Sequence, residues 1–182
     1  MTQLETLMPD VYAAPLLSES ECDQILKDAE KHTLFSHADS TITFASGARG
    51  PEVLQKNQLL PDLQNLFWQS VESKVQDQLL PALNTLGLNL NATRDPQLIR
   101  YQAGSTSTPH RDTTSDKEGF RRYTLLIYLN DDYLGGHTYF TAEENATRPT
   151  KGSALIFASD KEHCGTKVHK GTKHLYCLFL GK

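Results

Sequence analysis

The chain has 182 residues, of which 38% are hydrophobic, enough for one compact domain with a single core. Its formal net charge of −4 argues against a protein built mainly to neutralise nucleic-acid phosphates. No stretch approaches the roughly 18 apolar residues of a membrane span, and the N-terminus lacks the pattern of an export signal, so we expect a soluble cytoplasmic protein with no nucleic-acid or membrane partner.

The first predicted element is a helix over residues 19–32. Ser18 and Glu21 have the spacing of a capping box, in which each of the two residues satisfies a backbone N–H of the other. Apolar residues then follow on one side of the helix: Ile25, Leu26 and Ala29. We expect this side to pack on the core.

Two segments follow before the middle of the chain. Residues 36–50 are rich in Ser, Thr, Ala and Gly, which predicts one short strand and a loop that is able to touch a substrate. Residues 61–86 carry apolar residues at helical spacing and begin with Pro61, which suits the first position of a helix. Pro81 is expected to bend or split this second helix, because proline has no backbone N–H and its ring clashes with the preceding turn.

From Pro96 onward the pattern changes to short runs of β-branched, aromatic and aliphatic residues. The predicted strands lie at residues 97–102, 123–130, 137–140, 153–157 and 174–180. Several strands without intervening helices indicate antiparallel sheets that close into a jelly roll, or double-stranded β-helix. We therefore expect one mainly β domain of the α+β class over residues 1–182. Helical support would occupy about residues 1–90 and pack on one face of a core formed by about residues 91–182.

His110 and Asp112 are the first residues that suggest chemistry. In extended backbone, side chains two residues apart lie on the same face, so one metal ion could bind both. A His-x-Asp triplet is common, however, and its ordinary interpretation is a surface histidine beside a solvated aspartate.

The C-terminal region offers three candidates for a third ligand, and spacing alone does not choose between them. His174 lies inside an apolar predicted strand, and His169 lies in what looks like a turn. His163 follows the end of a predicted strand, where a side chain can project into the mouth of a barrel. Two histidines with one carboxylate form a set that suits Fe(II) and leaves coordination positions open.

Four spaced motifs stand in order between residues 96 and 180. They are Y-x-x-G-x5-H-x-D from Tyr101, R-x-T from Arg122 leading into Y-L-N at residues 128–130, G-G-x-T-x-F from Gly135, and H-x4-V-x2-G-x-K from His163. Together they resemble the prolyl 4-hydroxylase-like branch of the 2-oxoglutarate/Fe(II)-dependent dioxygenases. The resemblance covers about half of the chain, and it departs from the family at His137, where relatives commonly carry Glu.

The resemblance implies that Fe(II) is bound by His110, Asp112 and His163, and so selects His163 among the three candidates. It also implies that Lys173 binds the distal carboxylate of 2-oxoglutarate, as a buried carboxylate needs a cation.

Two tyrosines complete the implied cosubstrate site. Tyr128 would add a hydroxyl to the distal carboxylate, and Tyr101 would lie near the metal end of 2-oxoglutarate. Their ordinary interpretation is as core aromatic residues with satisfied hydroxyls. Other motif residues are interpreted structurally: Thr124 as a strand residue, Arg122 as solvated or ion-paired, and Gly104, Gly135, Gly136 and Gly171 as turn residues.

The implied function is a 2-oxoglutarate- and O2-dependent hydroxylase of peptidyl proline that releases succinate and CO2, with ascorbate as a candidate reductant. A peptide or protein would be its partner, and residues 36–50 could close over it. Hydroxylation of peptidyl lysine or of a small molecule is an alternative. So are a zinc hydrolase, in which Lys173 has no purpose, and a non-catalytic jelly-roll module. Cys22, Cys164 and Cys177 form no CxxC pair and are expected to be reduced thiols, as in the cytoplasm.

Overall fold

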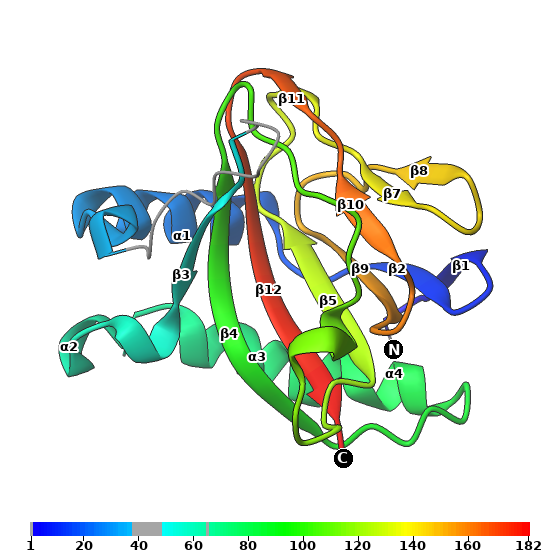
Figure 1. Cartoon of the computed structure of the whole chain (residues 1–182). Helices are drawn as coiled ribbons and strands as arrows, with labels where there is room; N and C mark the ends of the chain where they lie inside the picture. The colour runs from blue at the N-terminus through cyan, green and yellow to red at the C-terminus, as the bar shows by residue number, and fades with distance from the viewer. Residues whose placement is uncertain (1, 38–48, 65) are drawn as a thin grey trace.

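The computed structural model describes residues 2–37, 49–64 and 66–182 (Figure 1). The short strand and the loop predicted within residues 36–50 fall almost entirely on residues 38–48, and therefore lie outside the described residues. No helix in the described ranges is long and apolar enough to cross a membrane.

The described elements are mainly strands. In chain order the strands are β1 (Glu5–Met8), β2 (Val11–Pro15), β3 (Glu52–Gln55), β4 (Ala92–Tyr101), β5 (Tyr123–Tyr128), β6 (Leu134–Gly135), β7 (Thr138–Phe140), β8 (Asn145–Thr147), β9 (Ser153–Ala158), β10 (His163–Gly165), β11 (Val168–Lys170) and β12 (Lys173–Gly181). The helices are α1 (Glu19–Lys31), α2 (Pro61–Gln64), α3 (Trp68–Lys74) and α4 (Leu80–Asn84), with a π-helical turn at Val75–Leu79 and short 3-10 turns at Leu34–His37, Lys56–Gln58 and Asp112–Ser115.

The strands form one large sheet and two small ones, with antiparallel pairing throughout the described part. The large sheet has seven strands in the order β1-β2-β9-β5-β12-β4-β3. The small sheets are β10-β7-β8 and β11-β6. In Figure 1 the small sheets lie over one face of the large sheet, and the helices lie on its other side. The predicted mainly β jelly roll is thereby confirmed.

Two hydrophobic clusters occupy the two faces of the large sheet. Alternate residues of a strand point to opposite faces, so β12 contributes Tyr176 and Leu178 to one cluster and Leu175 and Cys177 to the other. The first cluster also contains helix residues: Cys22, Ile25 and Ala29 of α1 and Trp68 and Val71 of α3. The second lies between the large and small sheets, and it surrounds the pocket described below.

The first predicted helix agrees closely with α1. Ser18 Oγ accepts a hydrogen bond from the Glu21 backbone N–H at 3.3 Å, and Glu21 Oε2 accepts one from the Ser18 N–H at 2.8 Å, so the capping box is present. The helix ends at Lys31, one residue before the predicted end.

The second predicted helix is wrong as one continuous element. Residues 61–86 instead form α2, α3, the π-helical turn and α4 in succession. Trp68 Nε1 donates to the Leu63 carbonyl at 3.2 Å, which satisfies a carbonyl of α2 where that helix stops. Pro81 lies in the first turn of α4, two residues after the end of the π turn at Leu79, where the missing backbone N–H of proline is tolerated.

The N-terminal half is not only the helical support that the sequence predicted. Residues 5–15 form β1 and β2, and residues 52–55 form β3, all within the large sheet. These three strands are short, and β2 and β3 join the sheet through strands that are remote in sequence, β9 and β4. Strands of this kind carry little local signal.

Strand β4 begins at Ala92, earlier than the predicted residue 97. It passes through Pro96 because the ladder with β12 contains an irregularity there: Gln97 is opposite Cys177, whereas Arg94 is opposite Phe179. Asp95 has a positive φ of 53° at this place. A bulge leaves residues outside the ladder, so it can accept a proline that cannot donate a hydrogen bond.

Gly152 joins three parts of the large sheet. Its N–H donates to the Tyr128 carbonyl at 2.7 Å, and its carbonyl accepts from the N–H groups of Leu16 and Leu17. Its φ is +82°, and a Cβ added there would lie 2.1 Å from the Leu17 carbonyl oxygen. This position therefore requires glycine both for its backbone angle and for its close contact.

We predict that Gly152→Ala lowers the free energy of unfolding by roughly 3 kcal/mol or more, because backbone strain and a backbone clash add together. Gly119→Ala is the matched control, since Gly119 also has a positive φ, of +70°, but an added Cβ would meet nothing within 4 Å. The control should lose only about 1 kcal/mol. Urea unfolding measures both, and equal losses would contradict the role given to the Leu17 contact.

Candidate metal centre and adjoining pocket

His110 and His163 are held together by their backbones. The His110 N–H donates to the His163 carbonyl and the His163 N–H donates to the His110 carbonyl, both at 3.0 Å. This reciprocal pair is an isolated antiparallel bridge between the segment before the Asp112–Ser115 turn and strand β10. The two imidazole rings lie with their centroids 4.5 Å apart.

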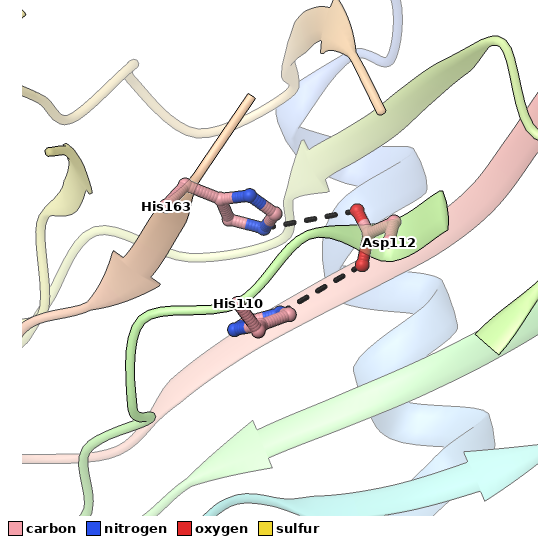
Figure 2. A group of neighbouring side chains, drawn as sticks. All are labelled: His110, Asp112 and His163. Carbon is pink, nitrogen blue, oxygen red and sulfur yellow. Dashed lines mark ion pairs between the residues drawn. The ribbon is translucent and has the colours of Figure 1, made fainter. Parts of the chain in front are cut away.

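Asp112 completes the group, as Figure 2 shows. Arg111 has extended backbone angles, so His110 and Asp112 project to the same side, as the two-residue spacing predicted. His110 Nε2 lies 3.7 Å from Asp112 Oδ1, and His163 Nε2 lies 3.7 Å from Asp112 Oδ2. One ligand atom from each of the three residues lies within 4.8 Å of the others, and no second group of this kind occurs in the described ranges.

Both histidines present Nε2 to this centre. His110 Nδ1 lies 2.8 Å from the Thr108 carbonyl, and His163 Nδ1 lies 3.0 Å from the Lys161 carbonyl. A carbonyl only accepts, so each Nδ1 carries the proton and each Nε2 has a lone pair for a metal ion. Burial lowers the pKa of His163 below its ordinary value, against the opposing effect of the Asp112 carboxylate, and so favours the neutral ligand form.

The other two candidate histidines lie elsewhere. His169 is exposed on β11, so its predicted position in a turn is wrong. His174 lies on the opposite face of β12 from Lys173, with its ring 5.9 Å from Phe35, and burial lowers its pKa to about 4. The structure thus brings His163, and neither of the others, to His110 and Asp112.

A pocket of about 280 Å3 extends from these three residues along the inner face of the large sheet. Strands β4 and β12 supply much of its wall, and Lys173 lies in it together with the three candidate ligands. The apolar and weakly polar residues that line it include Val53, Ile99, Leu126, Thr138, Leu175 and Cys177. Asp112 supplies the one carboxylate among the described lining residues.

Lys173 is a buried cation, with 1% of its surface exposed. Its Nζ donates to the Gly136 carbonyl at 2.7 Å and lies 5.3 and 5.0 Å from the ring centroids of Tyr101 and Tyr128. No carboxylate forms an ion pair with it within the described part of the chain. Burial lowers its pKa to about 7, and the charge of Arg148 acts in the same direction. The pocket is therefore suited to an anion at this end.

The two tyrosines lie on the two strands that flank β12, Tyr101 on β4 and Tyr128 on β5. The Tyr128 hydroxyl lies 2.6 Å from Thr138 Oγ1, and burial raises its pKa far above the ordinary value. Burial also raises the pKa of Tyr101 to about 12, partly offset by a hydrogen bond with Ser107. Both hydroxyls therefore remain protonated and can donate, and both also have the satisfied partners of ordinary core tyrosines.

Sequence reasoning gave no role at this site to Thr124, Ser159 or Arg121. Thr124 Oγ1 bonds Asp112 Oδ2, and Ser159 bonds Thr124. The Arg121 guanidinium lies 3.7 Å from the ring centroid of Phe179, a residue of the pocket wall, and forms an ion pair with Asp95. Arg122, by contrast, is exposed. Nothing in a single sequence separates these adjacent arginines, because both precede the strand. The four motif glycines all have positive φ, as predicted.

The comparisons with known proteins agree with this geometry. Residues 96–180 match the 2OG-Fe(II) oxygenase superfamily. Prolyl 4-hydroxylase 1 of Arabidopsis thaliana is 31% identical over 100 residues, which cover 43% of this chain and 35% of that protein. Procollagen-lysine,2-oxoglutarate 5-dioxygenase 1 of Mus musculus is 26% identical over 97% of this chain and 24% of that protein. The chain thus spans about a third or less of the length of these two relatives.

Among solved structures, the viral collagen prolyl hydroxylase of Paramecium Bursaria Chlorella virus-1, in complex with 2OG, has the same fold. The TM-score is 0.69 at 21% identity, and the match covers 94% of this chain and 95% of that one. This overlap is wider than the match over residues 96–180.

We predict that Lys173→Met stabilises the ligand-free protein in a pH-dependent way. The folded-state pKa is lowered to about 7, while an unfolded lysine keeps its proton to about pH 10.4. Below pH 7 the Lys173 side chain is charged in both the folded and the unfolded protein, and burial of this charge lowers the stability of the folded state. As pH rises from 7 to about 10.4 the folded state loses the proton first, so this loss of stability becomes smaller. The gain from Lys173→Met should be on the order of 3 kcal/mol at pH 6 and small at pH 10.

Denaturant unfolding at the two pH values measures this gain. Lys170→Met is the control, because Lys170 is exposed on β11 and should show little change at either pH. An equal effect of Lys173→Met at pH 6 and pH 10 would show that the lysine is not an uncompensated buried cation.

Proposed function

We propose that this chain is a 2-oxoglutarate- and O2-dependent hydroxylase of peptidyl proline, a proposal supported by the match of residues 96–180 to the 2OG-Fe(II) oxygenase superfamily. The whole of residues 1–182 would act as one oxygenase domain. Ascorbate as a reductant and a cytoplasmic location remain predictions. The single observation that carries the proposal is the buried Lys173 in the same pocket as a His-Asp-His group.

The donor set fits ferrous iron. Two neutral imidazole nitrogens and one carboxylate, converging from His110, His163 and Asp112, are the ligands that non-haem Fe(II) oxygenases use, and they leave positions open for other ligands. With 2-oxoglutarate and O2, bound iron supplies an oxidation that puts one oxygen atom into a substrate C–H bond and the other into succinate, and releases CO2. The chain's residues bind and orient these partners, and no protein nucleophile takes part.

Lys173 distinguishes this function from a zinc hydrolase. A hydrolase that used the same three ligands would need no buried cation in the pocket wall. For 2-oxoglutarate, by contrast, Lys173 offers the charge that a buried carboxylate requires, and the hydroxyls of Tyr128 and Thr138 lie beside it. The pocket is also small and largely apolar, so it would remove much of the cosubstrate from water.

The lining of the pocket favours a neutral substrate side chain. Asp112 is the carboxylate among the described lining residues, and metal binding would use it. A lysine ammonium would therefore enter a pocket that already holds the Lys173 cation and offers no further acid in the described part. A proline ring is apolar and carries no charge. Peptidyl lysine remains the second candidate, because a procollagen lysine hydroxylase aligns with 97% of this chain.

We predict that the parent protein releases succinate from 2-oxoglutarate in the presence of Fe(II). His110→Ala should abolish the release by removing a metal ligand. Lys173→Ala should raise the concentration of 2-oxoglutarate needed for half-maximal rate by about 100-fold, because a buried carboxylate loses its cation. Lys170→Ala changes an exposed lysine on β11, the strand that precedes β12 in sequence, and is the matched control that should behave like the parent. Full activity in His110→Ala would contradict the metal assignment.

The substrate prediction is tested with two matched peptide sets that differ only in a central proline or lysine. We expect mass spectrometry to find one added oxygen atom on proline, together with a peptide-dependent rise in succinate. The reverse preference would show that lysine is the substrate. Tight Fe(II) binding without succinate from any peptide would instead favour a non-catalytic module.

A further inference from the structure

Asp112 differs from the two histidines in how it is held. The histidines pair with each other through their backbones, whereas Asp112 begins a short 3-10 turn, Asp112–Ser115. Its backbone N–H donates to the Ser159 carbonyl at 2.9 Å, and the Thr113 N–H donates to the same oxygen at 3.3 Å. These bonds fix the backbone of Asp112, but they leave the orientation of its carboxylate to side-chain contacts.

One buried hydroxyl, that of Thr124, contacts this carboxylate, and a second, that of Ser159, contacts the first. Thr124 Oγ1 lies 2.5 Å from Asp112 Oδ2 and 2.9 Å from Ser159 Oγ. The residues Thr124 and Ser159 are 1% and 0% exposed, so water does not compete for these bonds. The two hydroxyls therefore form a chain that ends on the Asp112 carboxylate.

The direction of this chain follows from its members. A carboxylate oxygen only accepts, so the Thr124 hydroxyl donates its proton to Asp112 Oδ2. Its oxygen then accepts from the Ser159 hydroxyl, which is the remaining donor of the pair. A hydroxyl that accepts one hydrogen bond becomes a better donor in the next, so Ser159 strengthens the bond from Thr124.

Thr124 is also well placed to be rigid. It lies in β5, between β9 and β12, with Phe157 and Phe179 as its backbone neighbours in the ladders. Its β-branched side chain has few allowed rotamers. The hydrogen bond thus ties a ligand on a turn to the centre of the large sheet.

We propose that Thr124, oriented by Ser159, is a positioning residue that sets the Asp112 carboxylate for metal binding. An oxygen that already accepts a short hydrogen bond is a poorer second ligand, so the bond favours one metal–oxygen contact from Asp112 over two. This keeps coordination positions for other ligands. The identity of the metal as Fe(II) rests on the proposed function, whereas the positioning itself rests on the contacts of Thr124.

The test compares Thr124→Val, Thr124→Ser and Ser159→Ala by anaerobic titration of the full chain with Fe(II). Thr124→Val keeps the shape of the side chain and removes the donor, so Fe(II) affinity should fall about 10- to 100-fold. Thr124→Ser retains the hydroxyl and should recover affinity to within about threefold of the parent, allowing for its freer rotamer. Ser159→Ala should weaken binding less, and adding it to Thr124→Val should cause no further loss, because it acts through Thr124.

Ser105→Ala is the matched control. Ser105 is also a buried hydroxyl, 1% exposed, but its Oγ has no hydrogen-bond partner among the described residues, and Ser105 is not one of the residues that line the pocket. Its Fe(II) affinity should equal that of the parent. Melting temperatures measured without metal report whether each variant folds. If Thr124→Val does not fold, the proposal is tested by comparing the Fe(II) affinities of Ser159→Ala and Ser105→Ala: weaker binding by Ser159→Ala alone supports it, and equal affinities overturn it.

Fe(II) affinity of Thr124→Val within about twofold of the parent would overturn the proposal, as would equal losses in Thr124→Ser and Thr124→Val. Failure of the proposed function gives a different result. In that case the parent and Thr124→Ser would bind Fe(II) more tightly than Thr124→Val, but no variant would release succinate. A parent that binds no Fe(II) would overturn both.

Discussion

The reciprocal backbone bonds between His110 and His163 are the constraint on which the site depends. The two residues lie 53 positions apart in sequence, and neither segment would hold its imidazole in place alone. The bridge makes one histidine the strand partner of the other, and carbonyls at residues 108 and 161 turn both Nε2 atoms to the same centre. Arg111, the one residue between His110 and Asp112, is extended, so the Asp112 side chain projects to the same side as that of His110.

The second organising feature is the buried side chain of Lys173. Lys173 lies on β12 opposite Tyr101 of β4, and the described chain gives it a carbonyl and two aromatic rings but no carboxylate. A fold selected for stability alone would place an apolar residue there, as burial of a lone cation is costly. The lowered pKa of Lys173 measures this cost. An anionic ligand would remove it, so binding and stability are linked at this residue.

The sequence predicted the second half of the fold better than the first, for physical reasons. Strands β5, β9 and β12 are long apolar runs whose partners are buried on both faces, whereas β1, β2 and β3 have four or five residues with mixed burial, and β2 and β3 depend on partners that are remote in sequence. The helical pattern over residues 61–86 was correct in period, but periodicity does not reveal where a chain breaks. The candidate ligand set and the role of Lys173 came from the resemblance of the spaced motifs to a known family, while the Thr124–Asp112 bond depends on side-chain distances that a sequence does not contain.

The site therefore combines parts of different rigidity. Lys173, Tyr128 and Thr124 project from the central strands of the large sheet, where each is paired in at least one ladder and Thr124 in two. His110 and Asp112 lie on a connecting segment that is held by one bridge and by Ser159. The anion end of the pocket is thus formed with the fold, and the metal end depends on a few directed hydrogen bonds. A bound metal ion would join that segment to β10 a second time, so ordering of the segment and metal binding would reinforce each other.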